Sequence, residues 1–494
     1  MLAHRLVAVD ERTQRTDEDV RRIDEITRRL ERALEALARD TETLGAENAG
    51  LERRLLDLER SENARADVVA RSLSALHDTV NLSARRGAFA RRATRVVVLT
   101  HHVESWDSLD DIVRIMRESE DFEPVVVSIP RRFDGDGALR DEELVHRELA
   151  SRGVPHLRAS SDMVSDLLRF VKVLEPDVII RQSQWDRDVD ERLAVELLTF
   201  ARICVVPYET MNLVVNVPDP RRGIVNTAVD AELHRVAWLV FCANEAVRAD
   251  AVRDGLLEGR QFRVVGHPKA DVLRTARPAW PVPSEGPGGP RRPRVVWSSH
   301  HSIGAGWTCF GLFPEVAEEM LEWAREGEVE IVWMPHPALL PYVDRPTSSY
   351  SREQMDDWRT RWDALENTHV VQGSRYAPVL AAADAMMTDG LSMLVEFQVL
   401  NKPVLFLERS GHRPFTAVGT KVVEGTHSVD GVASARRVLE RVRTEGDDLS
   451  DVQLRNVREL FGEPGAAARV VEVMREEIGL LRARPGVFPD RGTR

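Results

Sequence analysis

Cysteine and long apolar runs are scarce in this sequence of 494 residues. The three cysteines lie far apart, which excludes a disulfide framework and a cysteine-based zinc site and is typical of a reducing compartment. No apolar run is long enough to span a bilayer, and no signal peptide is recognisable. A net charge of −13 argues against a nucleic-acid partner. We therefore expect a soluble, cytoplasmic protein, with peripheral attachment to the inner face of the plasma membrane as the alternative location.

Residues 1–90 differ in pattern from the rest of the chain. An apolar residue recurs every seven positions over six heptads, at Ile23, Leu30, Leu37, Leu44, Leu51 and Leu58. Such a seam predicts an α-helical coiled coil and, through it, a homo-oligomer. The alternative is a long solvated helix that packs on the globular part of its own chain.

The remaining residues alternate between short apolar strands and amphipathic helices. Twelve strands are predicted, at 95–100, 123–129, 155–157, 177–181, 203–206, 237–242 and 262–265, and then at 294–298, 328–334, 369–371, 385–388 and 403–407. Residues 277–293 contain six prolines and three glycines, a composition typical of a linker. The pattern predicts an α/β protein with two Rossmann-like, doubly wound domains, at residues 91–276 and 294–494, whose ligands bind beyond the carboxyl ends of the strands.

One turn between a buried strand and a helix is the strongest candidate for a ligand site. It contains Thr388 and Asp389, and the helix then begins at Leu391, Ser392 and Met393. The first turn of a helix presents free backbone N–H groups and the positive end of the helix dipole, so it favours an anion. The Ser392 hydroxyl adds a donor. We therefore predict a phosphate-binding site at this turn.

Polar residues also follow several other strands, where they would share the same edge of a sheet. The candidates in the second domain are Ser298, Ser299, His300, His336, Ser374 and Arg375. Those in the first domain are His101, His102 and Glu209. Pro337 restricts His336 to an extended conformation at the end of its strand.

Four segments resemble motifs of the CDP-glycerol glycerophosphotransferases, the teichoic-acid polymerases and primases. Val265–Leu273 resembles their GxPKxDxL element, Trp297–His300 their WAPT element, and Trp333–Pro337 their KxHP element. Thr388–Glu396, together with Asn401–Phe406, resembles TDYSSxxxDF…KPxxF. The segments occur in the family's order within residues 95–475. The resemblance implies a GT-B fold with an acceptor domain first and a nucleotide-donor domain second.

The resemblance also implies an activity and roles for particular residues. The activity would be transfer of glycerol phosphate, or a related alditol phosphate, from a CDP-activated donor to a hydroxyl of a cell-wall or capsular polymer at the membrane surface. His336 would contact the phosphates, Ser392 and the backbone of Leu391–Met393 would cradle the diphosphate, and Glu396 would bind a donor hydroxyl. No cofactor and no metal ion are expected.

The sequence departs from the family's motifs at three places. The first domain of the family carries a WHGT element whose histidine is the favoured base, whereas Pro207–Thr210 here contains no histidine. The base is then Glu209, His101 or His102, or it is absent. The TDYSS element has lost a hydroxyl, and Met334 replaces the lysine of KxHP. Two alternatives therefore stay open: a GT-B glycosyltransferase that uses a nucleotide-sugar, and a non-catalytic coiled-coil scaffold.

Overall fold

The computed structural model of the chain describes residues 2–88, 93–133, 138–160, 164, 166–209, 212–283, 291–304, 308–345 and 348–483. The chain divides into two compact units, residues 1–81 and residues 82–494. Each unit is described by itself below.

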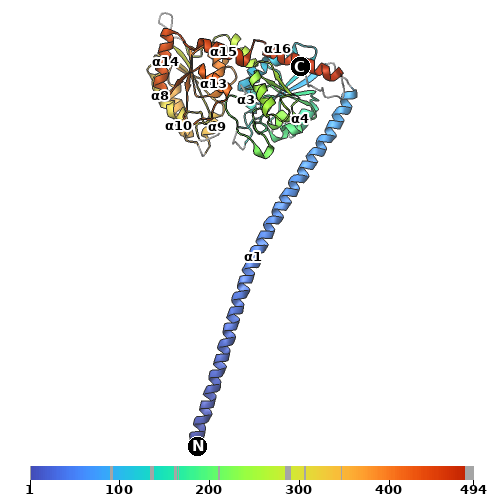
Figure 1. Cartoon of the computed structure of the whole chain (residues 1–494), viewed down its shortest axis with the longest axis vertical. Coiled ribbons are helices and arrows are strands. Elements are labelled where there is room, and N and C mark those ends of the chain that lie inside the picture. The colour runs from blue at the N-terminus through green and yellow to red at the C-terminus, as the bar shows by residue number, and fades with distance from the viewer. Residues whose placement is uncertain are drawn as a thin grey trace. The chain divides into compact units, whose positions relative to one another are not determined.

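The first unit is helical. It lies within a single helix, α1 (Leu2–Ala88), drawn in blue in Figure 1. The six residues of the heptad seam are 59–64% exposed along this helix. The predicted helix is confirmed, and its pairing with a second helix stays a prediction. Among the described residues, no helix, α1 included, is both long and apolar enough to cross a bilayer.

The second unit contains two parallel sheets. The first has seven strands in the order β3-β2-β1-β4-β5-β6-β7. Their bounds are β1 Thr94–Thr100, β2 Phe122–Ser128, β3 His156–Arg158, β4 Val178–Arg181, β5 Arg202–Val205, β6 Leu239–Cys242 and β7 Phe262–Val264. The helices between them are α2 (Asp110–Arg117), α3 (Glu142–Ser151), α4 (Leu167–Val173), α5 (Glu232–Val236) and α6 (Glu245–Asp254), and α7 (Pro268–Thr275) follows β7.

The second sheet has six strands in the order β10-β9-β8-β11-β12-β13. Their bounds are β8 Arg294–Ser299, β9 Glu330–Pro335, β10 Thr368–Val370, β11 Ala385–Thr388, β12 Val404–Leu407 and β13 His427–Val429. The helices are α8 (Phe313–Arg325), α9 (Leu339–Val343), α10 (Arg352–Asp363), α11 (Ala377–Ala382), α12 (Leu391–Glu396), α13 (Ala417–Glu424), α14 (Val432–Glu445) and α15 (Ser450–Phe461). All twelve predicted strands are present, and the sequence reading missed only β13 among the described strands.

Both sheets carry a core on each face, which explains why their strands are nearly continuous apolar runs. In β1, Val97 and Leu99 belong to one core cluster, whereas Val96 and Val98 belong to the cluster on the opposite face. Helices cover both faces of each sheet in Figure 1. The predicted class, two doubly wound α/β domains preceded by a long N-terminal helix, is confirmed.

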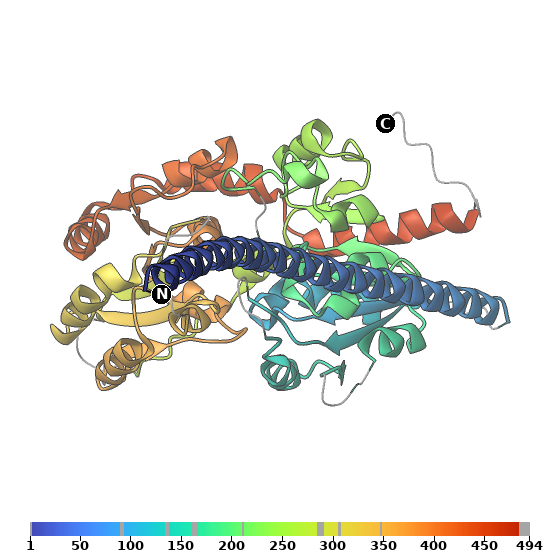
Figure 2. The same ribbon diagram turned by 90° about the horizontal axis from the view of Figure 1, so that it is seen from below.

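The last described helix, α16 (Ala466–Ala483), packs on the first sheet although it follows the second in sequence. Val470 and Met474 are fully buried in a core cluster that also contains Val96 and Phe122. Figure 2 shows this red helix alongside the blue-green strands of the first sheet. The segment 294–494, predicted as one domain, therefore returns at its end to the first sheet and ties the two halves of the second unit together.

Candidate functional site

The strand order reverses at one point in each sheet, which we call the switch point of that sheet. In the first sheet this point lies between β1 and β4, and in the second it lies between β8 and β11. In open parallel sheets, ligands bind beyond the carboxyl ends of the strands at such a point. The loops after these four strands therefore define the candidate site, and they contain four of the predicted residues, His101, His102, His300 and Asp389.

A buried carboxylate holds the second-sheet loops together. Asp389 accepts a hydrogen bond from the backbone N–H of His300 at 2.6 Å and another from the N–H of Leu312 at 2.5 Å. The hydroxyl of Thr388 accepts the N–H of Gly390 at 2.9 Å. Burial raises the pKa of Asp389 to about 7. The predicted turn is therefore present and tightly fixed at the end of β11.

Helix α12 starts directly after this turn, with Gly390 as its N-cap. Leu391, Ser392 and Met393 are half-buried there. The first N–H groups of a helix have no acceptor within the helix, so they are available to an anion. Binding of a phosphate at this position stays a prediction.

Three histidines gather at the ends of β8 and β9. The ring centroid of His336 lies 5.4 Å from that of His300 and 4.3 Å from that of His301. His336 is exposed, and its Nδ1 accepts the backbone N–H of Ala338 at 3.1 Å. Its neutral ring therefore carries the proton on Nε2, which is left to donate to a ligand. His300 is buried, and burial followed by the charge of His301 holds its pKa well below 6.5.

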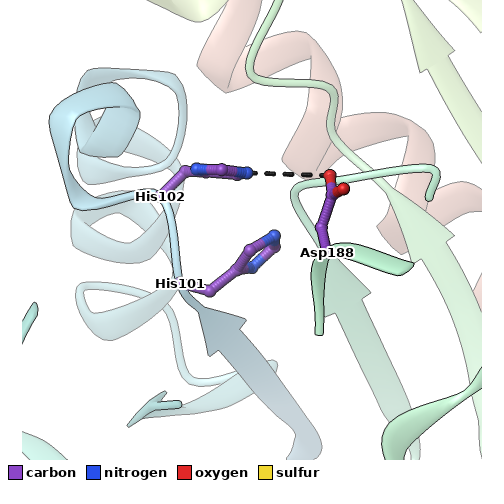
Figure 3. A group of neighbouring side chains, drawn as sticks. All are labelled: His101, His102 and Asp188. Atoms are coloured by element: carbon purple, nitrogen blue, oxygen red, sulfur yellow. Dashed lines mark ion pairs between the residues drawn. The ribbon is translucent and has the colours of Figure 1, made fainter. Parts of the chain in front are cut away.

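In the first sheet, His101 and His102 form the loop after β1. Both backbone N–H groups donate to Oε1 of Gln182 at 3.2 Å, so the loop after β4 holds the loop after β1 in place. The Nε2 of His102 lies 3.7 Å from Oδ2 of Asp188, and Figure 3 shows both rings beside this carboxylate. His101 is fully buried, which together with the charge of His102 holds its pKa well below 6.5.

Glu209 follows β5 and is half-buried. Burial raises its pKa to about 7, the charge of Asp188 adds to this effect, and Lys269 opposes it. Its neighbour Tyr208 packs its ring against His102 at 4.5 Å. A carboxyl group with such a pKa exchanges protons near neutral pH, as a general base must.

Two of the predicted site residues in the second domain, Ser374 and Arg375, contact the first domain. Ser374 is fully buried, its hydroxyl donates to Oε2 of Glu148 at 2.7 Å, and it accepts from Nε of Arg152 at 2.8 Å. The guanidinium of Arg375 donates to the backbone carbonyl of Ser151. The loop after β10 is thus part of the contact between the two sheets' domains.

Glu396 also has protein partners on both carboxylate oxygens. Oε1 lies 2.9 Å from Nζ of Lys269, and Oε2 accepts from the hydroxyl of Tyr376 at 3.1 Å. The Lys269 and Glu396 side chains are only 5% and 4% exposed. This ion pair joins α7 to α12, and sequence reasoning had given Lys269 no contact of its own.

The four motif segments of the sequence analysis meet in the folded protein. The GHPKADVL segment contacts the turn segment through Lys269 and Glu396. The segment after β8 contacts the segment of β9, because the hydroxyl of Ser299 accepts from the indole of Trp333 at 2.9 Å. It also contacts the turn segment through Asp389. Ser298 is buried at the end of the same strand. Segments far apart in sequence therefore build one structure around the second switch point.

A surface pocket of about 410 Å³ lies elsewhere, beyond β12 and β13. Its lining includes Arg409, Ser410 and His412. None of the predicted site residues lines it. One lining residue, Arg409, donates to the backbone carbonyls of Ser302 and Gly311 in the loop after β8. We place the candidate site at the switch points because the predicted histidines and the carboxylate of Asp389 lie there.

No family model and no curated protein matches the chain. Solved structures do match. The S. aureus protein MnaA, solved with UDP, is 14% identical, with 80% of this chain and 100% of that chain covered and a TM-score of 0.52. UDP-GlcNAc 2-epimerase from Neisseria meningitidis, bound to UDP-GlcNAc, is 12% identical, with 78% and 100% covered and a TM-score of 0.50. The wall teichoic acid polymerase TagF is 13% identical, with 83% and 93% covered and a TM-score of 0.51. These similarities show that the two-domain body has the predicted GT-B fold.

Proposed function

We propose that the chain is a transferase that takes glycerol phosphate, or a related alditol phosphate, from a CDP-activated donor and passes it to a hydroxyl of a cell-wall or capsular polymer. The observation that carries this proposal is the meeting of the four motif segments at the second switch point, where Asp389 and the Lys269–Glu396 pair join them. The fold that the chain shares with TagF supports the same function. The reaction would take place in the cytoplasm, at the inner face of the membrane.

In the proposed reaction the acceptor hydroxyl attacks the phosphorus that carries the alditol, and CMP leaves. The diphosphate lies against the N–H groups of Leu391–Met393 and the hydroxyl of Ser392. The Nε2–H of His336 donates to a phosphate oxygen and offsets the charge that develops there. Glu209 takes the proton of the acceptor hydroxyl, since it is half-buried and its pKa is raised to about 7. His101 is less suited to this role because burial, followed by the charges of His102 and Arg181, holds the pKa of its ring well below 6.5, which makes it a weak proton acceptor.

A nucleotide-sugar donor is the second candidate. The observation that favours it is the equal similarity of the fold to two proteins solved with UDP or UDP-GlcNAc. The diphosphate of either donor would bind at the same helix N-terminus. The two functions therefore differ in the nucleobase of the donor and in the group that is transferred. Comparing the binding of CDP with that of UDP separates them.

Ser392→Ala is expected to weaken CDP binding by about 1.5–3 kcal/mol, the worth of one charge-assisted hydrogen bond. His336→Ala is expected to raise the activation free energy of turnover by at least the same amount. The reason is that the hydrogen bond from His336 strengthens as negative charge develops on the phosphate oxygen. Isothermal titration with CDP measures the first effect. Ser410→Ala, in the pocket beyond β12, is the matched control and should bind CDP normally. If Ser410→Ala weakens binding and Ser392→Ala does not, the donor site is in the wrong place.

We also propose that α1 makes the protein a homo-oligomer, most simply a dimer. Its seam leaves six large aliphatic side chains 59–64% exposed, and a second copy of the same helix would cover them. Full-length protein is therefore expected to be dimeric in light scattering at micromolar concentration. Leu37→Glu with Leu44→Glu should yield monomers, whereas Glu35→Gln with Arg39→Gln, off the seam, should not. A monomeric parent protein would refute the proposal.

A further inference from the structure

We propose that His101, His102 and Asp188 bind a divalent transition-metal ion of the Zn²⁺ class. One ligand atom from each residue lies within 4.8 Å of the other two. The Nε2 of His102 is 3.7 Å from Oδ2 of Asp188, too long for a hydrogen bond. In a tetrahedral zinc site with bonds of about 2.0–2.2 Å, ligand atoms stand about 3.3–3.6 Å apart. The three groups thus need only small side-chain rotations to close on an ion.

Three of the four ring nitrogens in this cluster are buried without a hydrogen-bond partner among the described residues. His101 is 0% exposed, and neither of its ring nitrogens has a hydrogen-bond partner among the described residues. The same is true of Nε2 of His102. Buried polar groups are rarely left unpaired, because losing water without a replacement partner is costly. A bound metal ion would satisfy two of these nitrogens at once. Figure 3 shows that the rings and the carboxylate come together from separate elements.

The surrounding residues orient the three candidate ligands. Gln182 fixes the backbone at both histidines, and the hydroxyl of Ser183 donates to Oδ2 of Asp188. Metal-binding carboxylates commonly have such a hydrogen-bonded support. The candidate ligands therefore lie on held loops at the switch point of the first sheet.

The local charge also permits a cation. Arg131 is nearby, but it forms ion pairs with Glu104 at 2.6 Å and Asp141 at 2.9 Å. Arg181 pairs with Asp186 at 3.1 Å. These pairs offset the two buried guanidinium groups. The carboxylate of Asp188 keeps a weaker contact with Arg187, at 3.9 Å. Its negative charge is therefore available to a metal ion.

The ligand types select the class of metal. Two imidazoles and one carboxylate suit Zn²⁺, Co²⁺ or Ni²⁺, whereas Mg²⁺ and Ca²⁺ prefer oxygen ligands. Three protein ligands leave a fourth position for water or for a substrate oxygen, as catalytic zinc sites do. The sequence does not predict a metal site, because the cysteines lie far apart and Asp188 is more than eighty residues from the two histidines in the chain.

Binding can be tested without any assay of turnover. Full-length protein is treated with a chelator, desalted and titrated with Co²⁺ while visible absorption is followed, and Zn²⁺ is then added in competition. We expect one equivalent of Co²⁺ with the intense bands of a four- or five-coordinate ion, displaced by Zn²⁺. His102→Gln and Asp188→Asn should each weaken the affinity for Co²⁺ by at least about 100-fold. Substitution of residues that only support a metal ligand costs up to about 100-fold, and loss of a ligand itself should cost at least as much.

The matched control is His427→Gln. His427 also faces acidic residues, with its Nε2 2.9 Å from Asp447, but this pair is already hydrogen-bonded. The control should bind Co²⁺ like the parent protein. Absence of Co²⁺ and Zn²⁺ binding, binding that survives both site variants, or binding lost only in His427→Gln would each overturn the proposal. Circular dichroism and thermal unfolding identify a variant that fails to fold. The two site variants lie on different loops, so if one fails to fold, the Co²⁺ affinity of the other tests the proposal.

Discussion

Lys269→Ala is expected to lower the free energy of unfolding by about 3–5 kcal/mol, because it leaves the carboxylate of Glu396 buried without its partner. The two side chains are 5% and 4% exposed and lie 2.9 Å apart. Among the residues that the structure describes, the hydroxyl of Tyr376 is then the remaining hydrogen-bond partner, on the other carboxylate oxygen. Chemical denaturation of full-length protein measures the loss. The effect is large because an unpaired buried charge costs far more than the pair itself contributes.

The chain offers a control for this prediction with the same chemistry at the surface. Lys421 pairs with Glu459 at 2.6 Å, but the side chains are 56% and 45% exposed. Lys421→Ala should therefore cost no more than about 1 kcal/mol. The double variant Lys269→Met with Glu396→Leu should recover much of the lost stability, since apolar side chains replace both charges. Equal losses in Lys269→Ala and Lys421→Ala would show that the ion pair between α7 and α12 is not formed.

Glu209→Gln is expected to lower turnover of the donor by about 10²- to 10⁴-fold, the usual contribution of a general base. The carboxylate must be ionised to accept a proton, and its pKa is raised to about 7. Activity of the parent should therefore fall as the pH decreases through about 7, and this acid limb should be absent from the glutamine variant. The measurement is the pH dependence of kcat/KM.

Variants of the neighbouring residues distinguish Glu209 from the other candidate bases. If the acid limb survives in Glu209→Gln but disappears in His101→Gln or His102→Gln, the base is that histidine. Glu245→Gln, on the first turn of α6, is a suitable control and should keep the parent's rate and profile. A rate and acid limb unchanged in all three site variants would place the base elsewhere, with His300 and His301 as the next candidates.

Strands could be predicted from the sequence wherever a buried apolar run forms them. Strand β13 was missed because its three residues, His427–Val429, include two polar side chains and lie at the end of the sheet. The packing of α16 was also beyond sequence reasoning. Its apolar face indicates that it is half-buried, but the pattern does not tell which of two sheets it covers.

For the site, the sequence predicts which loops contain the polar residues, but it does not predict which side chains those residues contact. His101 and His300 lie at switch points, as their positions after β1 and β8 predict. Ser374 also follows its strand as expected, yet its partners are Glu148 and Arg152 of the first domain. Asp188 stands several residues after β4 and reaches His102 only because a short 3-10 turn brings it back. Such pairings depend on the path of the chain in space.

Thermal unfolding of full-length protein with CDP, UDP, GDP or CMP present tests whether the chain binds a CDP-activated donor at α12. A ligand at 100 times its Kd stabilises the folded state by about 2.7 kcal/mol. We expect that CDP raises the Tm of the parent and of Ser410→Ala, and that this rise is smaller in Ser392→Ala. A rise with UDP alone would contradict the proposed donor and favour a nucleotide-sugar. No rise with any of the four nucleotides would contradict the donor site itself.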